Sequence, residues 1–201
     1  MKPLIGLCAL LLGLGLASAA AAAPSCAAEG KVAYLCGPTN VEDMDLAPGG
    51  RWIIGSGMTS PTVPVGHLYA IDAPARAFHE ITPDVSSSAQ APYGDCPGQL
   101  DLAKFAPHGL FVTSDRVYLV NHGGRQAIEV FSLSMGADGP ALKWIGCAVL
   151  PDNGSGNGVA PLPDGGFAAT KFQAAGDEKA FSKMSERAPT GAVYAWAPAA
   201  A

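Results

Sequence analysis

Residues 42–54 read EDMDLAPGGRWII, and residues 157–169 repeat the same layout as NGVAPLPDGGFAA. A third copy, residues 108–120, reads HGLFVTSDRVYLV and aligns with the other two after a one-residue gap in the turn. Each copy places a turn of Pro, Gly or Asp between two short apolar strands, which is typical of a tight antiparallel hairpin. Because a recurring unit determines the architecture of a chain, the three copies predict a repeat fold.

Further strands follow each hairpin. A third strand with alternating large residues is predicted at residues 66–72, 126–132 and 190–196, and a fourth strand at 77–81 and 142–149. Four-stranded antiparallel units that recur every 40 to 65 residues or so are typical of β-propeller blades. The sequence therefore predicts an all-β fold, a partial β-propeller of about three blades. A β-sandwich is the alternative, but it does not explain why the turns match. Residues 177–187 have helical character and are expected to form a surface insertion.

The start of the chain has the pattern of a secretory signal peptide. Met1 and Lys2 precede an apolar run over residues 3–17, and alanines continue to residue 23. This pattern predicts a signal peptide at residues 1–23 and a mature domain at residues 24–201. The apolar run is too short to cross a hydrocarbon core of about 30 Å, so a retained membrane anchor is the weaker alternative.

Composition narrows the partners and the compartment. The formal net charge is −5, which does not suit nucleic acid or an anionic membrane surface, so we expect a small-molecule partner. The cysteines beyond the leader are Cys26, Cys36, Cys96 and Cys147. An even number in an exported chain predicts disulfides and a periplasmic or secreted location. Three pairings are possible, of which Cys96 with Cys147 is favoured.

The third repeat ends after its third strand. A blade needs neighbours on both sides to bury its faces, and fewer than three complete blades cannot close a ring. We therefore expect either a truncated chain or a chain that self-associates to complete the propeller.

Polar residues begin the first strand of every repeat, at Glu42, His108 and Asn157. First strands line the central channel of a propeller, so these side chains are expected to converge. Oxygen ligands from separate blades suit calcium, which takes six to eight of them at about 2.3 to 2.6 Å. The alternative is that Glu42 and Asn157 cap strands or hydrogen-bond turns.

A histidine pair is predicted across the second hairpin. His108 and His122 each lie about seven residues from Asp115 in the turn, so they fall at nearly opposite positions of the two strands. Opposed residues hold their Cβ atoms about 4.5 to 5.5 Å apart, so one imidazole can orient the other as a general base. Two structural histidines are the alternative.

At these residues the chain resembles the paraoxonase and arylesterase family, within the gluconolactonase and strictosidine-synthase-like group of six-bladed propellers. The matching pieces cover only the first half of a family member; they are residues 41–46, 107–110, 120–122, 128–131 and 150–158.

The resemblance implies a calcium-dependent hydrolase. Glu42 and Asn157 would be ligands of the catalytic calcium, Asp43 a ligand of a second, structural calcium, and His108 and His122 the catalytic dyad. The family often has aspartate where this chain has Gly158, and it draws its other catalytic-calcium ligands from later blades.

The leading hypothesis is hydrolysis of lactones or aryl esters, with His108 as base and His122 as its partner. A non-catalytic propeller that binds a ligand or scaffolds, and an inactive fragment, are the rivals.

Overall fold

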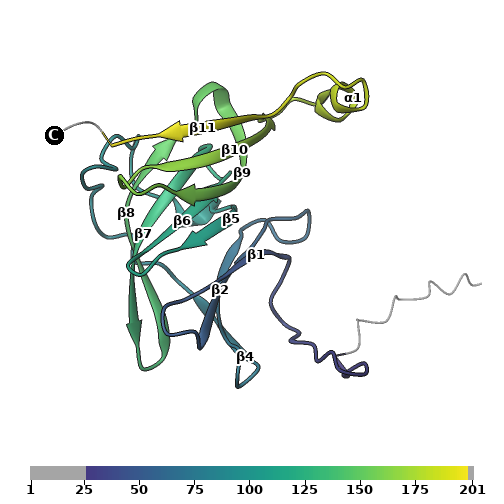
Figure 1. Ribbon diagram of the computed structural model, residues 1–201, viewed down its shortest axis with the longest axis vertical. Coiled ribbons are helices and arrows are strands. Elements are labelled where there is room, and N and C mark those ends of the chain that lie inside the picture. Colours follow the sequence, from purple (N-terminus) through teal and green to yellow (C-terminus); the bar gives the residue numbers. More distant parts are fainter. Residues whose placement is uncertain (1–25, 199–201) are drawn as a thin grey trace, which may run out of the picture. The chain divides into compact units, whose positions relative to one another are not determined.

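The computed structural model describes residues 26–198, and Figure 1 shows their path. The described residues fall into two units, which divide between Tyr34 and Leu35. The predicted signal peptide, residues 1–23, lies outside the described residues. In the first unit, Glu29 and Val32 exchange two backbone hydrogen bonds, and the Tyr34 hydroxyl donates to Glu29 Oε2 over 3.2 Å.

The second unit begins with a four-stranded antiparallel sheet, the first sheet, in the order β1-β2-β3-β4. Its strands are β1 (Val41–Leu46), β2 (Trp52–Gly57), β3 (His67–Asp72) and β4 (Ala77–Ile81). Gly49 and Gly50 have φ angles of 88° and 73°, which side-chain-bearing residues rarely adopt. The predicted turn is therefore present, and it closes the β1–β2 hairpin.

The second sheet has the same topology, in the order β5-β6-β7-β8. Its strands are β5 (Pro107–Val112), β6 (Arg116–Asn121), β7 (Ala127–Gly136) and β8 (Gly139–Val149). The hairpin of β7 and β8 is longer than predicted, since pairing continues to Gly136 and Gly139. Gly139 has a φ of 110°, which allows the tight turn.

The third sheet contains three antiparallel strands in the order β11-β10-β9. They are β9 (Gly154–Pro161), β10 (Phe167–Ala174) and β11 (Ala192–Trp196). The short helix α1 (Ala180–Ser185) lies between β10 and β11, where helical character is predicted. Two single 3-10 turns, Leu102–Lys104 and Pro151–Asn153, precede β5 and β9.

Two clusters of buried apolar side chains join the three sheets. In the first cluster, Ile54 and Leu68 of the first sheet pack with Leu119 of the second. In the second cluster, Val120 of the second sheet packs with Phe167 of the third. Because successive residues of a strand point to opposite faces, the second sheet is covered on both sides. The all-β prediction is confirmed as three antiparallel sheets with one short helix, and no helix of residues 26–198 is long and apolar enough to cross a membrane.

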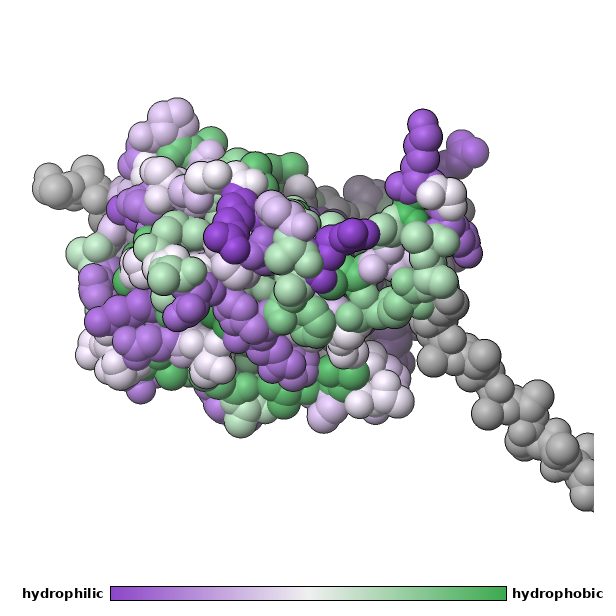
Figure 2. Space-filling view, turned by 90° about the horizontal axis from the view of Figure 1, so that it is seen from below, coloured by the Kyte–Doolittle hydropathy of each residue, from purple (hydrophilic) through white to green (hydrophobic). Residues whose placement is uncertain are grey.

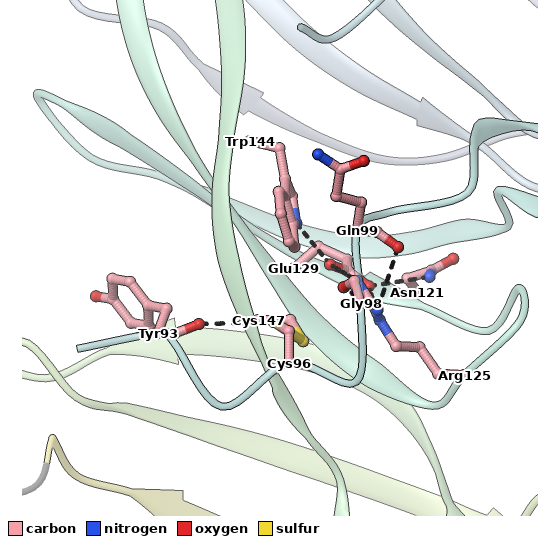
Figure 3. Close-up of a disulfide and its surroundings, with 9 residues drawn as sticks. All are labelled: Tyr93, Cys96, Gly98, Gln99, Asn121, Arg125, Glu129, Trp144 and Cys147. Carbon is pink, nitrogen blue, oxygen red and sulfur yellow. Dashed lines mark hydrogen bonds and ion pairs between the residues drawn. A yellow bond between two sulfur atoms is a disulfide. The ribbon is translucent and has the colours of Figure 1, made fainter. Parts of the chain in front are cut away.

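A disulfide attaches the long β4–β5 connection to the second sheet. Cys96 in this connection is bonded to Cys147 in β8, with 5.5 Å between their Cα atoms, so the favoured pairing is confirmed. Cys26 and Cys36 are also disulfide-bonded. Figure 3 shows that the Cys96–Cys147 bond lies near a buried polar cluster around Glu129, the residue that pairs with Cys147 across β7 and β8.

Removing the Cys96–Cys147 bond should destabilise the fold. The bond closes a loop of 51 residues, and cross-links of this kind typically contribute about 2–4 kcal/mol, mainly by restricting the unfolded chain. We expect the Cys96→Ser/Cys147→Ser double variant to lose that much free energy of unfolding in a urea titration. Dithiothreitol should lower the urea midpoint of the parent more than that of the double variant, because the double variant has no Cys96–Cys147 bond to lose. An unchanged midpoint relative to the oxidised parent would contradict a structural role for this bond.

Candidate functional site

The first strands of the three sheets lie next to one another, and β5 is the middle strand. Two carboxylates of β1 fix this arrangement, since Asp43 Oδ2 accepts from Leu110 N and Asp45 Oδ2 accepts from Val112 N, both over 2.8 Å. A side-chain ladder thus joins β1 to β5 where the two strands form no backbone ladder. The ladder places the beginning of β1, with Glu42, beside the beginning of β5, with His108.

Gly109 sets the approach of β5 to β9. A Cβ atom at this position would collide with the carbonyl group of Asn157, so any other residue would push the two strands apart. The glycine that follows His108 therefore explains how Asn157 comes close to the histidine's own strand. Glu42 and His108 lie at the second position of β1 and β5, as the repeat predicts. Asn157 lies farther into its strand than predicted, because β9 already begins at Gly154.

Four side chains form a continuous polar chain at this end of the strands. Glu42 Oε1 lies 3.3 Å from His108 Nε2, and His108 Nδ1 lies 2.9 Å from His122 Nε2. His122 Nδ1 is in turn 2.7 Å from Gln126 Oε1. The contact between the two imidazoles, which the spacing about Asp115 predicts, is therefore present.

The hydrogen-bond partners determine where the protons lie. Gln126 Oε1 can only accept, so His122 Nδ1 donates to it and leaves His122 Nε2 as an acceptor. His108 Nδ1 then donates to His122 Nε2. When both rings are neutral, the bare nitrogen is His108 Nε2, and it faces the carboxylate of Glu42. A lone pair and a carboxylate oxygen repel one another, so this contact favours a shared proton, a water molecule or a cation between them.

Burial differs along this polar chain. The His108 side chain is 17 % exposed and the Glu42 side chain 37 % exposed, so both can reach solvent or a ligand. Burial lowers the pKa of His122, and the positive charge of a protonated His108 would lower it further; the hydrogen bond to Gln126 opposes these effects. The environment therefore favours a neutral His122, which is the form that can accept a proton from His108.

The acidic side chain next to Glu42 has a different environment. The Asp43 carboxylate accepts from Met44 N and from Leu110 N, each over 2.8 Å, and Asp45 repeats this pattern with Leu46 N and Val112 N. Residues 43 and 45 share one face of β1, so the pattern D-x-D is the sequence signal for this bridge. Sequence reasoning assigned Asp43 only to a structural calcium and missed the bridge; the calcium role stays a prediction.

Gln126 is a second residue that sequence reasoning missed as part of the site. It directly precedes β7 and orients His122 from the third strand of the sheet. Its place in the polar chain depends on the pairing of β6 with β7, which joins Asn121 to Ala127. A glutamine at the first position of the predicted strand 126–132 carries no sequence signal of that kind.

The oxygen ligands at this site fit a hard cation, although one chain supplies only a few of them. Glu42 supplies two carboxylate oxygens and Asn157 one amide oxygen, and both residues are exposed. Within residues 26–198, no group of three or more His, Cys, Asp or Glu residues is arranged to hold a metal ion. Three oxygens fall short of the six to eight that calcium takes, so further ligands must come from water, substrate or other protein groups.

Comparisons with known proteins add no relative: no family model matches the chain, and no curated protein matches it.

The lowered pKa of His122 predicts a specific pH dependence of stability. Because the unfolded chain protonates this histidine more readily than the folded chain does, stability should fall as the pH drops through the ordinary pKa of about 6.5. The loss should level off below the folded-state pKa. We expect thermal melts between about pH 7.5 and 5.5 to show a flatter dependence in His122→Gln than in the parent. Equal slopes in the two proteins would contradict a depressed pKa at His122.

Proposed function

We propose that this chain is a partial β-propeller that hydrolyses small lactones or aryl esters with the help of calcium, outside the cytoplasm. The observation that carries the proposal is the polar chain of Glu42, His108, His122 and Gln126, in which the base nitrogen, His108 Nε2, lies at the accessible end. The disulfides are compatible with an extracellular or periplasmic location.

The arrangement of the sheets supports a propeller reading. Each complete sheet runs from its first to its fourth strand in sequence order, and Glu42, His108 and Asn157 all belong to first strands. Four-stranded sheets whose first strands meet at an axis are typical of propeller blades. In such a fold the axis is where a ligand binds.

The chemistry follows from the direction of the hydrogen bonds. His108 Nε2 takes a proton from water as the water oxygen bonds to the acyl carbon. The Nδ1 proton of His108 can pass to His122 Nε2, and the Gln126 amide stabilises the resulting imidazolium through its Oε1. The acyl carbon–oxygen bond then breaks, and the leaving alkoxide or phenoxide takes a proton back from the histidine pair. A lactone thereby gives a hydroxy acid, and an aryl ester gives an acid and a phenol.

Glu42 and Asn157 would hold the cation beside this base. A bound calcium ion supplies positive charge for the oxyanion that develops on the carbonyl oxygen. Glu42 is placed to bind such a cation because its Oε1 otherwise faces the bare nitrogen of His108. The same carboxylate thus serves either the proton on His108 or the metal.

The proposal is tested by assaying the purified chain against a panel of lactones and aryl esters, first with calcium and then with excess chelator. We expect hydrolysis that disappears on chelation and returns when calcium is restored. Calcium binding without turnover of any member of the panel would overturn the hydrolase assignment and favour a binding propeller. Turnover that is indifferent to chelation would overturn the role of calcium.

The surface gives no reason to expect a polyanionic partner. On the face shown in Figure 2, hydrophilic residues lie among apolar ones and do not form one continuous patch. The chain is acidic overall, so nucleic acid would be repelled at long range. A small neutral or weakly charged ester is consistent with both observations.

A further inference from the structure

Equivalent residues of the three first strands differ greatly in exposure. With Glu42, His108 and Asn157 aligned, Met44 is equivalent to Leu110 and to Val159. Leu110 is 5 % exposed and Val159 8 %, because each packs against the preceding sheet, whereas Met44 is 58 % exposed. Leu46 is likewise 54 % exposed where its equivalent, Val112, is 8 %. The first sheet therefore has the apolar residues of a sheet-to-sheet joint, but no other sheet of residues 26–198 packs against them.

Met44 and Leu46 point away from the second sheet. They alternate along β1 with Asp43 and Asp45, whose carboxylates bond to the backbone of β5. Since side chains alternate between the two faces of a strand, Met44 and Leu46 lie on the opposite face. Ile53 pairs with Leu46 across β1 and β2 and adds to the same face.

The third sheet has an uncovered face of the opposite character. Ala160 pairs with Ala168, and Thr170 pairs with Val193, so these four small or β-branched residues share one face. Phe167 lies on the other face, which packs on the second sheet. A hollow of about 280 Å³ lies over the uncovered face, lined by residues of β9, β10 and β11, and Val193 beside it is 71 % exposed.

The uncovered faces of the first and third sheets have the same complementarity as the existing contact between the second and third sheets. At the joint of the second and third sheets, Gly109 of β5 is the small residue against which the backbone of β9 packs, at Asn157 and Gly158. The repeat-equivalent of Gly109 on β9 is Gly158, which borders the hollow. Met44 and Leu46 of a following sheet would enter that hollow just as Val159 packs at the existing joint. Protruding apolar side chains on one face thus meet small residues on the other.

We infer that a second copy of this chain covers both faces. The third sheet of each copy packs on the first sheet of the other, through Ala160 and Ala168 on one side and Met44 and Leu46 on the other. Two such joints are related by a two-fold axis, and together they cover both faces of each copy, so the assembly closes. Two sets of three sheets then form one ring, within the range of about four to eight blades found in propellers.

The closed ring also completes the proposed metal site, and this step rests on the proposed function. A two-fold axis through the ring brings Glu42 and Asn157 of both copies around one position. Together they supply six side-chain oxygens, two from each Glu42 and one from each Asn157, which satisfies the lower limit of six for calcium. The inference therefore predicts a single calcium ion shared by two chains.

Mass and metal stoichiometry test this inference without any assay of activity. We expect light scattering coupled to gel filtration of the full chain in calcium to give twice the mass of one chain. Calorimetric titration should give one calcium ion per two chains. Chelation should weaken the dimer, because the shared ion would contribute ligands across the axis.

A single surface substitution tests the contact between the two copies without changing the proposed calcium ligands. Ala160→Arg places a long charged side chain in the hollow and leaves Glu42 and Asn157 intact, so we expect a monomer that has lost calcium binding. The matched control is Ala141→Arg, at an exposed alanine of β8 in the second sheet, which should keep the dimer and its stoichiometry. Circular dichroism would check that both variants stay folded.

The possible outcomes distinguish this inference from the proposed function. A monomer that binds one calcium ion per chain and hydrolyses esters would overturn the shared ring but leave the function standing. A dimer with one ion per two chains and no hydrolysis would support the ring and overturn the function. A dimer that Ala160→Arg leaves intact would contradict the assigned joint.

Discussion

Replacing His108 with glutamine is expected to reduce kcat/KM for calcium-supported ester hydrolysis by about 10²- to 10⁴-fold, the range that a general base contributes. Glutamine keeps a polar side chain that can hydrogen-bond to His122 but has no basic nitrogen to take the proton of water. The loss should appear mainly in kcat, since Glu42 and Asn157 remain to hold calcium. The assay is initial-rate kinetics with the best substrate of the panel, at saturating calcium.

Matched histidine variants give this prediction its control. His79→Gln changes an exposed histidine of β4 that packs on Trp52, outside the polar chain, and should leave the rate unchanged. His122→Gln should reduce the rate as well, because His108 then loses its proton-accepting partner. Equal rates in the parent and His108→Gln, with both proteins folded, would remove His108 from the mechanism.

Replacing Arg125 with methionine is expected to cost about 3–5 kcal/mol of unfolding free energy, the usual cost of leaving a buried charge without its partner. Glu129 is fully buried, and Arg125 donates to both of its oxygens, over 2.7 Å from Nε and 2.8 Å from Nη2. Asn121 and Trp144 donate to the same carboxylate, as Figure 3 shows. Methionine fills similar volume but leaves the carboxylate with only these two donors.

Two further variants make the Arg125 measurement specific. Adding Glu129→Gln to Arg125→Met removes the unpaired charge, so the double variant should recover part of the lost stability. Arg51→Met breaks the pair with Asp72, but the Arg51 side chain is 61 % exposed, so a smaller loss is expected. Guanidinium titrations measure all three. A loss in Arg125→Met no larger than in Arg51→Met would contradict the importance of the buried pair.

The strands of this fold were predictable because their signals are local. Alternating apolar residues and Pro or Gly turns identify β1, β2 and their equivalents, and the structure places strands at each predicted position. The length of the β7–β8 hairpin was not predictable. Leu133 and Met135 continue the alternation of β7, but residues 136–141 are small or polar without an apolar pattern, and their pairing depends on the turn at Gly139.

Glu42, His108, His122 and Asn157 could be predicted as members of the candidate site, whereas Gln126 and the contacts between the residues could not. The common position of Glu42, His108 and Asn157 in the repeat identified them, and the spacing about Asp115 brought His122 to His108. Strand irregularities between Val41 and Asp43 and between Pro107 and Leu110 shift the register, so distances could not follow from counting.

Long-range polar contacts could not be predicted from the sequence. The bridge from Asp43 to Leu110 spans 67 residues, and Arg125 reaches the carbonyl group of Gly98 in the β4–β5 connection. Such partners are chosen by the packing of one sheet on another and by the path of a connection. Neither has a signature within a short window of sequence.

The central claim is that one end of the first strands combines a calcium site with a histidine base. A crystal structure of the chain grown in calcium tests it most directly. We predict a calcium ion within about 2.3 to 2.6 Å of Glu42 and Asn157 oxygens, with His108 Nε2 facing a water molecule or substrate beside it. A structure in which Glu42 contacts only His108 and calcium binds elsewhere, or nowhere, would contradict the account.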